Sequence, residues 1–140
     1  MFGDNHFDKD INAAEDAFRK HLDKLEEAGR FPDFISREKS QNLVYTFLEG
    51  FENGWEFEKK YPKSKINPDT VCDELKTDWG SLRQIKTLGA SLGYVMRSIR
   101  EHYHLEREEE FIWYLESLKG SPFFKMVRVA LEEAKSHQNA

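Results

Sequence analysis

Apolar positions recur at helical spacing along most of the chain. Residues 11 to 25 carry apolar side chains three and four residues apart, and Gly29 then stands where a helix would stop. A second apolar stripe occupies residues 36 to 60. Gly50 and Gly54 weaken that segment, because glycine costs helix stability. The pattern predicts two long amphipathic helices, and a kink near the glycines of the second would fit the sequence.

The second half of the chain continues the helical pattern. The segment that begins at Asn67-Pro68-Asp69 is typical of a helix start, and apolar spacing predicts a helix over residues 68 to 79. Residues 82 to 103 carry the most regular stripe, whose apolar positions alternate by three and four as in a heptad seam. Two shorter helices are then predicted, one over residues 111 to 118 that Gly120 ends, and one that Ser121-Pro122 begins.

Strand signals are missing from the sequence. No segment combines strand periodicity with turn residues at both ends, and no internal repeat is present. We therefore predict an all-α fold: a single-domain bundle of five to six helices with short connections over residues 1–140. Residues 1–9 and 137–140 are expected to fray at its ends.

Composition adds limits on compartment and partners. Of the 140 residues, 39% are hydrophobic and 14% aromatic, which favours a packed domain over a disordered chain. The net charge of −5 argues against a polycation. Cys72 is the single cysteine, so no disulfide forms within the chain. No signal peptide and no run of eighteen apolar residues is readable, so we expect a cytoplasmic protein without a membrane segment.

Catalytic and metal-binding patterns are weak. Glu101 and His104 form one Glu-x-x-His pair, but di-iron bundles use two such pairs, and no second pair occurs. His102 and His104 would point nearly oppositely on a helix. No P-loop, zinc-protease motif or nucleophile elbow is present. We therefore predict a protein that is not an enzyme and that has no catalytic residues, no cofactor and no metal.

One segment resembles the helix-turn-helix of DNA-binding domains. Leu88-Gly89-Ala90-Ser91, followed by Val95, Arg97 and Ile99, looks like a glycine turn and the start of a recognition helix. The resemblance implies a first helix over residues 81 to 88 and a reading helix over residues 91 to 103. It also implies that Tyr94, Arg97 and Arg100 face DNA, with Arg83 and Lys86 near phosphates.

The same residues also fit one continuous helix over residues 81 to 103. Gly89 and Gly93 would then lie inside the seam and let a neighbouring helix approach closely. Its cations would form a basic flank, and an acidic stripe on the second helix could meet that flank; the stripe is Glu49, Glu52 and Glu56. The two interpretations differ in whether residues 88–92 form a turn.

Aromatic residues exceed what one small core requires. Trp55 and Phe57, two residues apart, cannot both face the same core from a helix. Six aromatic residues are candidate interface anchors: Phe31, Phe34, Trp55, Phe57, Trp113 and Tyr114. The acidic run of residues 106–110 is either an interface or bare surface.

Two functions follow from these patterns. The first is a non-enzymatic protein-interaction module, such as an inhibitor, immunity-type protein, adaptor or assembly subunit. Its partner is another protein or its own copy, which it could meet through the heptad seam. The alternative is a helix-turn-helix DNA-binding regulator that uses residues 81–103 as a dimer.

Overall fold

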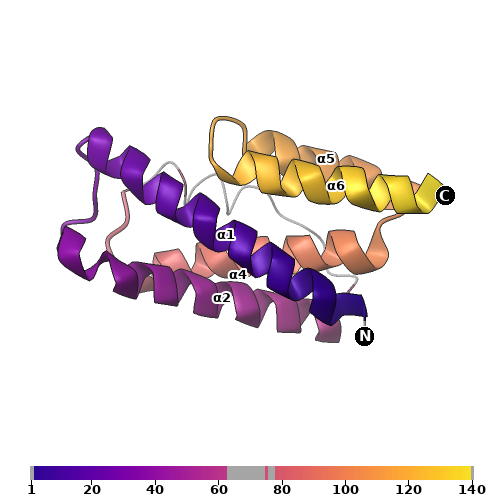
Figure 1. The fold of residues 1–140 in the computed structure, drawn as a ribbon, viewed down its shortest axis with the longest axis horizontal. Coiled ribbons are helices and arrows are strands. Elements are labelled where there is room, and N and C mark those ends of the chain that lie inside the picture. The colour runs from indigo at the N-terminus through magenta and orange to yellow at the C-terminus, as the bar shows by residue number, and fades with distance from the viewer. Residues whose placement is uncertain (1, 63–74, 76–77, 140) are drawn as a thin grey trace.

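The computed structural model is a bundle of helices (Figure 1). It describes residues 2–62, 75 and 78–139. The elements are α1 (Phe2–Glu27), η1 (Arg37–Lys39), α2 (Ser40–Lys60), α4 (Leu82–His102), η2 (Leu105–Arg107), α5 (Glu108–Ser117) and α6 (Phe123–Asn139). The described residues contain no strand, which confirms the predicted all-α class. The helix predicted over residues 68–79 falls almost entirely outside the described residues.

The helices form two layers. Helices α2 and α4 lie side by side and run in the same direction, while α1 crosses over them and α5 and α6 form a hairpin on the same side (Figure 1). The core lies between these layers and is rich in aromatic rings. Phe18 of α1 stacks on Phe47 of α2 with ring centroids 4.3 Å apart, and Phe123 of α6 lies 5.8 Å from Phe47. Burial of these rings supplies the main driving force for packing the layers together.

The pairing of α2 with α4 depends on glycines in both helices. A Cβ on Gly89 would lie 2.1 Å from the carbonyl oxygen of Phe47, and a Cβ on Gly54 would lie 2.0 Å from that of Ala90. Gly50 and Gly93 are equally crowded. The backbones of the two helices therefore touch, and both helices are continuous through their glycines.

Residues 88–92 do not form the turn that the helix-turn-helix resemblance implies. Those residues lie inside α4, so the segment lacks the geometry of a helix-turn-helix. The helical cost of Gly89 and Gly93 is offset by close contact with α2, which only a residue without a Cβ permits. The continuous-helix interpretation is confirmed. It also means that this seam is filled within one molecule and does not pair with a second copy.

Helix ends mostly follow the predicted signals. Gly29, at φ +71°, follows the end of α1, and Gly120, at φ +86°, separates α5 from α6. The hydroxyl of Ser121 accepts a hydrogen bond from the backbone N–H of Phe123, which caps α6. Helix is present from Phe2 and up to Asn139 within the two segments expected to fray. Among the described residues, no helix has the length and apolar character needed to span a membrane.

Candidate interaction surface

Helix α5 is fixed to the bundle by its inner face. Phe111 and Tyr114 are fully buried. The ring of Phe111 stacks on Tyr103, and the hydroxyl of Tyr114 lies 3.3 Å from that of Ser91 on α4. These contacts hold the helix in one orientation, so the opposite side of α5 is presented to solvent as a rigid surface.

The opposite side of α5 carries a large apolar pair. Ile112 is 43% exposed and Trp113 is 51% exposed. Glu109 and Glu116 precede and follow them at spacings of three and four residues, which places all four side chains on one side of the helix. We call these four residues the α5 outer face. Its centre is apolar and its two ends are acidic.

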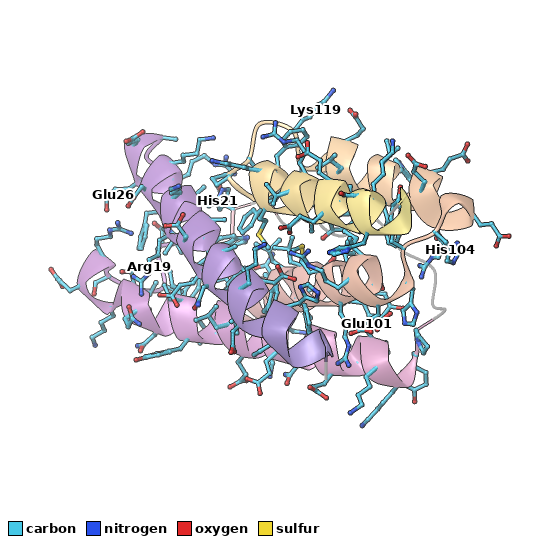
Figure 2. The ribbon with its side chains drawn as sticks, turned by 45° about the vertical axis from the view of Figure 1, so that its right-hand side comes forward. Arg19, His21, Glu26, Glu101, His104 and Lys119 are labelled. Atoms are coloured by element: carbon cyan, nitrogen blue, oxygen red, sulfur yellow. The ribbon has the colours of Figure 1, made fainter. Side chains whose placement is uncertain are left out.

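The acids around α5 differ in their partners. Glu108 faces Lys135 at 3.8 Å and Glu110 pairs with Arg107 at 3.0 Å. Glu116 pairs with Lys119, which extends into solvent from the turn after α5 (Figure 2). Glu109 is exposed, and it makes no ion pair within the described residues. The acidic run is thus partly used to hold the local structure and partly left at the surface.

The six predicted interface anchors divide into exposed and buried residues. Phe34, Phe57 and Trp113 are exposed, and Phe31 is half-buried. Trp55 and Tyr114 are buried, so the prediction is wrong for these two. The spacing explains both errors: Trp55 continues the buried stripe of α2 one turn after Phe51, and Tyr114 follows Phe111 by three residues.

Phe57 belongs to a smaller aromatic cluster at the end of α2. Its ring lies 4.7 Å from Tyr61 and 6.0 Å from Tyr94. The hydroxyl of Tyr94 donates a hydrogen bond to the carbonyl of Tyr61 at 2.7 Å. The cluster therefore also ties α2 to α4.

Four of the five residues assigned to DNA contact make contacts within the bundle. Lys86 pairs with Glu49 at 2.8 Å, the one place where the basic flank meets the acidic stripe among the described ion pairs. Arg97 donates to the carbonyl of Trp55 at 3.1 Å. The side chain of Arg100 is only 4% exposed. Tyr94 is half-buried in its cluster, and Arg83 is exposed. Of the four cations of this basic flank, Arg97 and Arg100 are directed inward.

Arg100 is the centre of a buried ion-pair network. Its guanidinium donates to both carboxylate oxygens of Asp10, at 2.8 and 3.0 Å, and to Glu133 at 2.8 Å. Burial raises the pKa of Asp10, while its hydrogen bonds with Arg100 oppose that shift. The network joins α1, α4 and α6 at one end of the bundle.

A second buried polar cluster lies between α2 and α4. Glu58 is only 1% exposed; its Oε2 accepts a hydrogen bond from Ser98 at 3.1 Å and lies 3.2 Å from Nε2 of His102. Burial raises the pKa of this carboxyl to about 7. Sequence reasoning missed Glu58, although its position seven residues after Phe51 continues the buried stripe of α2.

His21 is buried in the core, and the Glu101–His104 pair lies at the end of α4. The ring of His21 on α1 (Figure 2) lies 5.5 Å from that of Trp79 and 5.9 Å from that of Phe123. Burial lowers the pKa of His21 to about 4. Glu101 is in the last turn of α4, and His104 follows the end of that helix. Over the described part of the chain, no three His, Cys, Asp or Glu side chains are grouped so that they could hold a metal ion.

In comparisons with known proteins, no protein family, no curated protein and no solved structure matches this chain.

Proposed function

We propose that this protein is a non-enzymatic protein-interaction module and that its α5 outer face binds a basic surface of its partner. The observation that carries the proposal is the exposure of Trp113. Trp55 and Trp79 are buried in the core, whereas half of Trp113 is in contact with solvent, next to Ile112. Tryptophan is among the residues that most often contribute strongly to binding at protein interfaces.

The charges around Trp113 support a basic partner. Glu109 and Glu116 lie at the two ends of the apolar pair, where the rim of an interface is normally polar. Acidic side chains at a rim accelerate association with a positively charged surface and disfavour acidic competitors. The buried contacts of Phe111 and Tyr114 hold α5 in place beforehand, which lowers the entropic cost of binding.

Site-specific photo-crosslinking in living cells tests this proposal. A photoreactive phenylalanine analogue replaces Trp113 in one variant and Tyr45 in the matched control; Tyr45 is 64% exposed on α2, outside the α5 outer face. We expect a protein adduct from position 113 and none from position 45. Adding Glu109→Lys and Glu116→Lys should remove the adduct. Equal adducts from both positions, or none from position 113, would contradict the proposal.

A further inference from the structure

A groove between α1 and α6 has the complementary pattern to the α5 outer face. The two helices contact each other, and the groove has a volume of about 240 Å³. Its apolar floor is formed by Ala13, Ala17, Met126 and Val129. Alanines leave room above the α1 backbone, and methionine adapts its shape to an incoming side chain. The floor is therefore suited to a large apolar side chain.

Lysines border this floor. Lys9 and Lys20 of α1 and Lys125 of α6 line the groove and are exposed. Two acids, Asp10 and Asp16, also line it, and Asp10 is neutralised by its buried pair with Arg100. Glu133 lies beside the groove, where it pairs with Lys9 at 2.6 Å and with Arg100 at 2.8 Å, and Lys20 pairs with Asp16 at 3.0 Å. Counting Arg100 and Glu133, four cationic side chains face three acidic ones. The groove thus carries a small excess of positive charge in a chain whose net charge is −5.

The order of side chains along α1 mirrors that along α5. On α1, Lys9 and Lys20 enclose two small residues, Ala13 and Ala17, at helical spacing. On α5, Glu109 and Glu116 enclose two large apolar residues. At 1.5 Å per residue the lysines are about 16 Å apart along the axis and the glutamates about 10 Å. The flexible lysine side chains can reach inward over that difference.

We infer that the α5 outer face of one molecule docks into the α1–α6 groove of a second copy of this chain. The inference rests on the proposed function and names the partner of the same face. Phe111 and Tyr114 anchor α5 on its inner side, so the outer face cannot turn into the groove of its own molecule. Trp113 of one copy packs above Ala13 and Ala17 of the other. Glu109 and Glu116 then lie near the lysines that border the groove. Two copies related by a two-fold axis make this contact twice.

A charge-swap experiment tests the inference. One variant carries Lys20→Glu and Lys125→Glu in the groove, and the other carries Glu109→Lys and Glu116→Lys on the α5 outer face. All four side chains are at the surface, and the ion pairs that the described residues form with them, Lys20 with Asp16 and Glu116 with Lys119, are exposed. We therefore expect both variants to fold, which circular dichroism checks.

Sedimentation velocity over a dilution series is the readout. Wild type should self-associate, and each variant alone should bind itself at least about tenfold more weakly, because like charges then face each other. Mixing the two variants should restore association, since acidic and basic surfaces again meet in both contacts. Trp113→Ala should weaken wild-type association roughly 30-fold. Tyr45→Ala, the matched exposed control, should leave it unchanged.

The outcomes separate this inference from the proposed function. A monomeric wild type that still gives an adduct with a different protein from position 113 would overturn the second-copy inference and leave the proposed function standing. Self-association that neither variant weakens, or that mixing does not restore, would also overturn it. If wild type does not self-associate and position 113 gives no adduct, the proposed function is rejected together with the inference.

Discussion

Gly89 of α4 lies directly against the carbonyl oxygen of Phe47 on α2, at a point where a Cβ would come within 2.1 Å of that oxygen. The atom in its way belongs to the backbone, so a side chain at this position has nothing flexible to displace. Gly50, Gly54 and Gly93 are in the same situation. This contact determines how close α2 and α4 lie, and hence the layer on which α1 and α6 pack.

Gly89→Ala should therefore destabilise the protein. Alanine favours an isolated helix by about 1 kcal/mol over glycine, but the clash forces the helices apart and we expect a net loss of roughly 2 kcal/mol or more. Gly80→Ala is the matched control, because a Cβ there would lie 3.7 Å from the side chain of Gln84. Urea unfolding measures both variants. Equal stability of the two would contradict the close helix contact.

The sequence predicted this part of the fold for a physical reason. The heptad spacing of residues 82 to 103 identifies a buried seam, and two glycines one turn apart in it favour close helix approach. The same glycines also fit a turn, because local sequence does not say whether a second helix is near. The partner glycines, Gly50 and Gly54, were in the sequence, but they indicated only a weakened helix.

Glu58→Gln should change how stability depends on pH. The pKa of Glu58 is about 7 in the folded protein and near its ordinary 4.5 in the unfolded chain. The folded state therefore binds more protons between these values, so this group lowers the free energy of unfolding as pH rises from 4.5 to about 7. Urea unfolding at pH 4.5 and 8 gives the free energy of unfolding of variant and wild type. Between these two pH values, the variant should gain on the order of 2 kcal/mol in that free energy relative to wild type.

Glu56→Gln serves as the control for Glu58. It removes an exposed carboxyl from the same helix, and its stability should stay parallel to that of wild type across the pH range. A Glu58→Gln curve that also runs parallel to wild type would show that Glu58 does not titrate in this window.

His21→Leu should have the opposite pH dependence. The pKa of His21 is lowered from 6.5 to about 4 by burial, and its ring nitrogens make no hydrogen bond in the described structure. The unfolded chain thus binds more protons between these values, and wild type loses stability as pH falls from 6.5 to about 4. Over that range we expect the variant to gain roughly 2 kcal/mol relative to wild type. His137→Gln, at an exposed histidine, should show no such gain in the same unfolding series.

The Arg100–Asp10 pair should show strong coupling in a double-mutant cycle. Arg100→Met leaves the carboxylate of Asp10 buried without its partner and should cost about 3–5 kcal/mol. Asp10→Asn should cost less, because Arg100 keeps its hydrogen bond with Glu133. Thermal or urea unfolding of the double variant should give a loss well below the sum of the single losses. Additive losses would mean that the two side chains do not act as a pair.

The candidate surface was only partly predictable. The four consecutive apolar residues from Phe111 to Tyr114 span most of a helical turn, so some of them had to face outward, but the sequence could not say which, because the short helix carries apolar residues on both sides. Contacts of Tyr114 with Ser91 of α4, and of Phe111 with Tyr103 and with Arg107 of η2, decide which side is buried. The α1–α6 groove could not be predicted from the sequence for a different reason. It joins residues 9 to 20 with residues 122 to 129, and no local sequence pattern connects segments so far apart.

Binding through the α5 outer face is tested by the dissociation constant of Trp113→Ala for the partner that crosslinking at position 113 identifies, whether a second copy or another protein. Titration calorimetry on wild type, Trp113→Ala and Tyr45→Ala provides it, with unfolding curves to verify that all three fold. We expect a loss of roughly 30-fold for Trp113→Ala and no change for Tyr45→Ala. Unchanged affinity of Trp113→Ala would contradict the claim that the α5 outer face is the binding surface.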